Sequence, residues 1–196
     1  MEIFKEASAV GTGAPDAAEL EKINRYSKTP LTAEQVYRFQ VRLCDDQPDR
    51  DLERFDRASL PRLAELFRGK TGILDHEWSA KGQVARIYDT EVREEGHEAW
   101  ILASCYMLRT EKNADLIADI EGGIRREVSV GCAMGKATCS ICGQPYGVCE
   151  HRKGERYGRR QCLAVLSEPT DAYEFSFVAV PAQRQAGVTK GRKGGV

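Results

Sequence analysis

The sequence lacks any long uninterrupted run of apolar residues. Its longest apolar stretch, Ala99–Leu108, is interrupted by Ser104, and it is far shorter than the roughly 20 residues that a membrane-spanning helix needs. The amino terminus has no positively charged segment followed by an apolar one, which is the pattern of a secretory signal. We therefore expect no membrane association and a cytosolic location, where cysteines remain thiols or bind metals rather than form disulfides.

An excess of charge of either sign is also absent. The chain has 29 Lys and Arg residues against 30 Asp and Glu residues. Proteins that bind nucleic acid through their general charge are usually visibly basic, so this balance argues against specific nucleic-acid binding. Histidine is scarce as well, because only His76, His97 and His151 are present. His97 lies in a polar turn and we expect it at the surface.

Short strands dominate the pattern of apolar residues. Residues 37–43 alternate between apolar and polar side chains, as does a half-buried strand. Residues 60–67 repeat leucine and phenylalanine at helical spacing. About seven such strands and two or three helices predict an α+β fold, a small, mostly antiparallel β-barrel with flanking helices.

Three regions are expected along the chain. Residues 1–30 should form a mobile arm followed by a short helix, and residues 31–183 a single domain with a Cys/His insertion at 135–158. Residues 184–196 hold four positive charges, four glycines and no acid, which predicts a disordered basic tail.

Three polar residues stand on or beside predicted strands, in the order His76, Ser129, Glu174. Ser129 lies between Val128 and Val130, so in a strand it points away from both valines. A serine hydroxyl becomes a good nucleophile only when a base removes its proton, and His76 is the best candidate base. A carboxylate on the other ring nitrogen would orient the histidine, and Glu174 fits that role by position, with Asp171 close enough to compete.

These segments together resemble the phage prohead (capsid maturation) proteases, a family distantly similar in fold to the herpesvirus assemblins. The matching stretches include Val36–Asp45, Asp49–Asp51, Phe67–Lys70 leading to His76, the Ser129 strand, and Glu174–Ala182. The resemblance supports Glu174 as the acid of the catalytic group. It implies a serine endopeptidase that cleaves the scaffolding segment from the major capsid protein, and also itself. Such an enzyme would act inside the assembling prohead, in the host cytoplasm, without an organic cofactor. A homo-oligomer is compatible with the resemblance.

A cluster of metal-binding residues follows the serine strand. Cys139 and Cys142 form a Cys-x-x-Cys-Gly motif, and Cys149 and His151 follow closely. These ligand types and spacings predict a tetrahedral Zn²⁺ site, structural because four protein ligands leave no open position. The alternative is that free thiols cluster here by chance. A redox-active Cys-x-x-Cys pair is disfavoured, because no thioredoxin-like βαβ pattern surrounds the motif. The remaining cysteines fall on strand positions and should lie in the core, with Cys162 a reserve ligand.

Two other functions are compatible with parts of this pattern. The chain could be a catalytically inactive capsid-assembly (scaffolding) protein, or a zinc-knuckle protein that binds nucleic acid. A retained nucleophile and base argue against the first, and the balanced charge argues against the second. The sequence therefore favours a prohead-type serine protease with a structural zinc.

Overall fold

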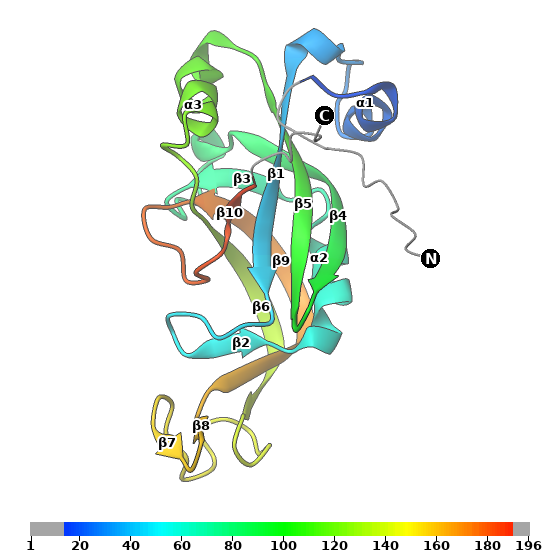
Figure 1. Ribbon diagram of the computed structural model, residues 1–196. Helices are drawn as coiled ribbons and strands as arrows, with labels where there is room; N and C mark the ends of the chain where they lie inside the picture. Colours follow the sequence, from blue (N-terminus) through cyan, green and yellow to red (C-terminus); the bar gives the residue numbers. More distant parts are fainter. Residues whose placement is uncertain (1–13, 190–196) are drawn as a thin grey trace, which may run out of the picture.

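The computed structural model describes residues 14–189 (Figure 1); the predictions for residues 1–13 and 190–196 lie outside this range. The described chain forms a mixed α+β structure built on one large sheet. Its helices are α1 (Ala17–Asn24), α2 (Leu60–Phe67) and α3 (Glu111–Glu121). Its strands are β1 (Val36–Asp45), β2 (Glu53–Phe55), β3 (Thr71–Leu74), β4 (Ala85–Glu95), β5 (Glu98–Leu108), β6 (Val128–Cys139), β7 (Arg156–Tyr157), β8 (Arg160–Gln161), β9 (Ala164–Phe177) and β10 (Gly187–Val188).

The large sheet has the strand order β10-β1-β5-β4-β3-β9-β2, and β6 pairs with β9 beside this path. Most neighbours are antiparallel, but β9 runs parallel to both β2 and β3. The strand β9 is therefore the centre of a mixed segment, with β3 on one side and β6 on the other. This arrangement places the ends of β3, β6 and β9 next to one another.

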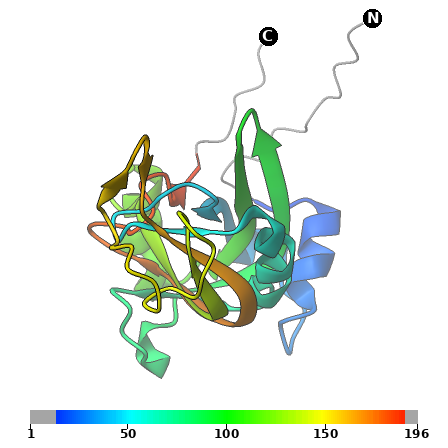
Figure 2. The same ribbon diagram turned by 90° about the horizontal axis from the view of Figure 1, so that it is seen from below.

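The core forms on the inner face of the curved sheet. The alternation expected for residues 37–43 is present, because Tyr37, Phe39, Val41 and Leu43 are all buried. Helix α2 covers part of this core with its apolar side, where Leu60, Leu63 and Phe67 are fully buried. Helix α1 lies against β4 (Figure 2). No helix in the described range is both long and apolar enough to span a membrane.

The expected closed barrel is not detected in residues 14–189, because continuous strand pairing does not join β6 to β10. The two strands nevertheless approach each other at one end. Glu127 and Gly187 form an isolated antiparallel bridge, and the Val188 N–H donates to the Arg126 carbonyl at 2.8 Å. The sheet therefore curls until β10 and the start of β6 are joined by a few backbone hydrogen bonds.

Strand β9 is continuous from Ala164 to Phe177, although its pairing with β6 is irregular near Ala172 and Pro169. One expectation about the end of the chain is corrected. Residues 184–189, expected to belong to the disordered tail, include β10, which pairs with Val41 and Arg42 of β1. The short β10 covers an edge of β1 that would otherwise expose unpaired backbone groups.

Strands β6 and β9 continue beyond β3 as a long paired ribbon, and β2 pairs with the far end of β9. Figure 1 shows the small strands β7 and β8 at the far tip of this ribbon. Cys139 at the end of β6 pairs with Ala164 at the start of β9, so residues 140–163 are a connection between two paired strands. The Cys/His insertion thus lies at the tip of the ribbon.

Candidate functional site

His76 lies in a tight turn directly after β3. The Glu77 N–H donates to the Leu74 carbonyl at 2.9 Å, which closes a four-residue turn. Both central residues, Asp75 and His76, have positive φ angles of 49° and 54°. This is the left-handed pattern of a type I′ turn, and aspartate and histidine tolerate it better than most residues. The turn brings the His76 ring back over the sheet instead of letting the chain leave it.

Glu174 is the hydrogen-bond partner of this histidine. The Nδ1 atom of His76 lies 2.8 Å from Oε1 of Glu174. The Glu174 side chain is only 4% exposed, whereas the His76 side chain is 42% exposed. A carboxylate can only accept a hydrogen bond, so in the neutral imidazole Nδ1 carries the proton and Nε2 has the lone pair. The geometry therefore presents Nε2 as a proton acceptor.

Ser176 completes a ring of hydrogen bonds around this pair. Its hydroxyl donates to Oε2 of Glu174 at 2.9 Å and accepts from the backbone N–H of His76 at 2.9 Å. Ser176 is fully buried. It fixes the carboxylate and the turn together, and sequence analysis missed it. The available signal was its spacing, because residues two apart on a strand share one face.

Ser129 lies on the same face as this ring. In the antiparallel pair of β6 and β9, Ser129 is opposite Ser176 and Gly131 is opposite Glu174. Opposite residues in such a pair point to the same side of the sheet. As the sequence predicted, the flanking valines face the other side, with Val128 in the core and Val130 packed against it. Ser129 itself is half-buried.

Gly131 lies opposite Glu174 and has no side chain to fill the space between them. An added Cβ at Gly131 would lie 2.5 Å from Oε1 of Glu174, well inside any normal contact. The missing side chain therefore leaves room for the carboxylate that bonds His76.

Ser129 and His76 do not hydrogen-bond to each other in the described structure. Catalytic hydrogen bonds are often long or misaligned without substrate and tighten when substrate binds. The competing acid, Asp171, is not near the histidine. Its carboxylate lies 3.3 Å from the ammonium of Lys70 and is half exposed. Glu174, and not Asp171, therefore contacts His76.

Two pockets flank the His76 turn. One, of about 360 Å³, includes Glu174, Trp78 and Tyr173 in its walls. The other, of about 250 Å³, includes Asp75, Ile124 and Glu127. A ligand in either pocket would be next to the His76 turn. His97 is exposed in the turn between β4 and β5, as expected, and its carbonyl accepts a hydrogen bond from Arg57.

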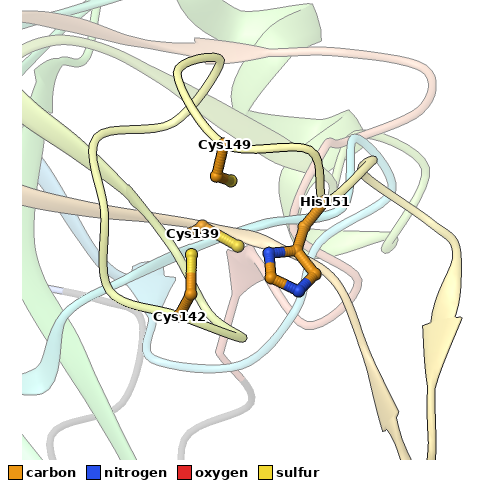
Figure 3. A group of neighbouring side chains, drawn as sticks. All are labelled: Cys139, Cys142, Cys149 and His151. Carbon is orange, nitrogen blue, oxygen red and sulfur yellow. The ribbon is translucent and has the colours of Figure 1, made fainter.

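The four predicted metal ligands come together at the tip of the ribbon. One donor atom from each of Cys139, Cys142, Cys149 and His151 lies within 4.8 Å of the others. Figure 3 shows these four side chains converging from two turns of the connection. The Gly143 N–H donates to the Cys139 carbonyl at 2.8 Å, and Gly143 has a φ of 74°, which lets the first turn close tightly. The group could hold a metal ion.

His151 adds an independent observation. Its Nδ1 atom is buried and has no hydrogen-bond partner, a costly state for a polar atom unless another ligand satisfies it. A metal ion within the cluster would do so. The ring is held by an edge-on contact with Tyr157, at 4.5 Å between centroids. The residues thus fit a bound metal.

The thiols of Cys139 and Cys162 have pKa values that are shifted in opposite directions. Burial alone would raise the pKa of the Cys139 thiol, but hydrogen bonds from the backbone N–H groups of Cys142 and Ile141 outweigh it and lower that pKa to about 6. Burial raises the pKa of Cys162 to about 11. The Cys162 sulfur lies 3.7 Å from the Cys139 sulfur, so it borders the cluster as the reserve ligand that the sequence suggested.

The cluster lies far from the histidine and serine. Cys139 is ten positions after Ser129 on β6, which corresponds to roughly 30 Å along a strand. No residue of the loop at 135–157 contributes to the two pockets beside His76. The metal group can support the ribbon but cannot touch a ligand bound at His76.

Comparison of the chain with protein-family models, with curated proteins and with solved structures found no match.

Replacing Gly131 by alanine should break the His76–Glu174 contact, because the new methyl group occupies the place of Oε1. We expect the downfield proton NMR signal of the hydrogen-bonded Nδ1–H of His76 to be lost. Gly135→Ala is the matched control, since a methyl group there meets the Glu168 carbonyl at 3.1 Å and not Glu174. An unchanged signal in Gly131→Ala would contradict the proposed packing.

Proposed function

We propose that the chain is a serine endopeptidase of the prohead-protease type. The observation that carries the proposal is the hydrogen bond of 2.8 Å between His76 and the buried Glu174. It holds a histidine as a base on the same sheet face as Ser129. A carboxylate, a histidine and a serine in these positions are the parts of a catalytic triad.

Each member has a defined role in this mechanism. Ser129 Oγ attacks the carbonyl carbon of the scissile peptide bond while His76 Nε2 takes its proton. Glu174 stabilises the resulting imidazolium through Nδ1–H. His76 then gives the proton to the leaving amine, and an acyl-enzyme on Ser129 forms. A water molecule hydrolyses this ester by the same route, with His76 again serving as the base.

The resemblance described above supplies the substrates of this proposal. They are the major capsid protein, its scaffolding segment and the chain itself, cut within the prohead in the host cytoplasm. The same resemblance favours a barrel. The hydrogen bonds between β10 and the residues leading into β6 support a partly closed one.

We also propose that the metal is Zn²⁺. Three thiolates and one imidazole favour it over harder cations. With four protein ligands and a position roughly 30 Å from Ser129, the ion would hold the connection between β6 and β9 in place and take no part in peptide hydrolysis.

Ser129→Ala should abolish processing of the major capsid protein while leaving the fold intact. Loss of a triad nucleophile lowers turnover by on the order of a millionfold, and removing one half-buried hydroxyl costs little packing. The measurement is co-expression with the capsid protein, read by gel and intact mass. Ser104→Ala is the control, because Ser104 lies in β5 away from His76. Processing by Ser129→Ala at the wild-type rate would remove the nucleophile from this account.

Glu174→Gln should slow the same processing, but less than His76→Ala does. An amide can still orient the ring but cannot stabilise the imidazolium. Asp171→Asn should leave the rate nearly unchanged, because Asp171 contacts Lys70 instead of His76. The opposite pattern, with Asp171→Asn inactive and Glu174→Gln active, would transfer the third role to Asp171.

Protein purified without a metal-affinity tag should contain one zinc per chain by elemental analysis. Cys142→Ser should lower this content, because it removes a ligand. Cys105→Ser is the control, since Cys105 is buried in β5 outside the cluster. Chelation should lower the thermal stability, because binding to a structural site contributes to folding. Zinc near zero, with all seven thiols titrating freely in the folded protein, would exclude the site.

A further inference from the structure

The larger of the two pockets beside His76 lies on the outer face of β3. It has a volume of about 360 Å³. Ile73 forms part of its floor, and the segment that follows His76 covers it with Trp78. Glu174 belongs both to this pocket and to the hydrogen-bonded pair with His76. The pocket is therefore continuous with the candidate catalytic group.

The charged groups around this pocket, Lys70 and Glu174, are already paired within the protein. The Lys70 ammonium contacts the Asp171 carboxylate, and Glu174 bonds His76 and Ser176. The Thr71 hydroxyl donates to the Ala85 carbonyl, and the Ser79 hydroxyl accepts from the Gly82 N–H. A charged or strongly polar ligand would have to compete with these contacts. The pocket is therefore suited to an apolar group.

Two aromatic side chains form the outer walls. Trp78 is 70% exposed and Tyr173 is 40% exposed, and their rings lie 5.3 Å apart between centroids. Exposed tryptophan and tyrosine are costly to leave in water and common at binding sites, where they provide a large rigid contact area. Their position at one pocket indicates that a ligand covers them.

The distance to Ser129 fits a peptide. The pocket floor is on β3, and Ser129 is on β6, with β9 between them. Two strand spacings are about 10 Å, which an extended peptide spans in about three residues. A peptide whose scissile bond lies at Ser129 can therefore place a nearby side chain in the pocket.

We propose that this pocket is the main specificity site and that it takes a large apolar side chain of the substrate, such as Leu, Met or Phe. The proposal rests on the protease function above. Trp78 and Tyr173 clasp the side chain, and Ile73 contacts its end. Specificity by apolar contact of this kind distinguishes side chains by size and gives differences of about 10- to 200-fold.

The test is cleavage of a mixed peptide library, with every cut mapped by mass spectrometry. The wild-type protein should show one position, at a fixed distance from the cut, that is enriched in large apolar residues. Trp78→Ala combined with Tyr173→Ala should lower kcat/KM for those peptides at least about tenfold and flatten the preference. Peptides with alanine at that position should be cut at nearly the wild-type rate. Ile124→Ala is the control, because Ile124 is equally exposed but lines the other pocket.

The outcomes separate this proposal from the function on which it rests. Cleavage by the wild type with a preference that the double variant leaves unchanged, or with a preference for charged residues, overturns the pocket assignment and leaves the protease. Cleavage of no peptide by wild-type protein overturns both. A loss of preference in Ile124→Ala instead of the double variant would transfer the specificity site to the second pocket.

Discussion

The buried carboxylate of Glu174 is the group on which the rest of the candidate site depends. An ionised group inside a protein is costly unless hydrogen bonds or an opposite charge compensate it. Here one oxygen bonds the His76 ring and the other accepts from the Ser176 hydroxyl. Gly131 provides the space that the carboxylate occupies, and the left-handed turn at Asp75 and His76 brings the histidine to it. Removing any one of these features takes away either one partner of the buried acid or the space that the acid occupies.

The mixed pairing around β9 explains how distant segments meet. Because β9 runs parallel to β3 and antiparallel to β6, the turn after β3 and the start of β6 reach the same end of β9. In this way the fold brings Ser129 and Glu174, which are 53 and 98 positions after His76, close to that histidine. Strands β6 and β9 then extend to the tip of the ribbon, where the Cys/His cluster lies in the connection between them. The ribbon thus connects the candidate catalytic group at His76 with the candidate metal site at its tip.

Local patterns in the sequence predicted much of this structure. The alternation in β1, the apolar spacing of α2 and the face of Ser129 follow from periodicity alone, and the four metal ligands follow from their spacing. The continuity of β9 and the pairing of β10 do not, because they depend on contacts between distant residues. Ser176 was missed because its only signal in the sequence is its spacing of two residues from Glu174, which does not show that the serine is buried. The role of Gly131 depends on its neighbour across the sheet, Glu174, which is 43 positions away.

The most direct test of the central claim is the reaction of the intact protein with a fluorophosphonate, followed by mass spectrometry of its peptides. Such a reagent phosphonylates a serine only when a neighbouring base activates it. The account predicts a single adduct on Ser129, absent when the protein carries His76→Ala and reduced when it carries Glu174→Gln. No adduct on Ser129 in the folded wild-type protein, or equal labelling of the His76→Ala variant, would contradict it.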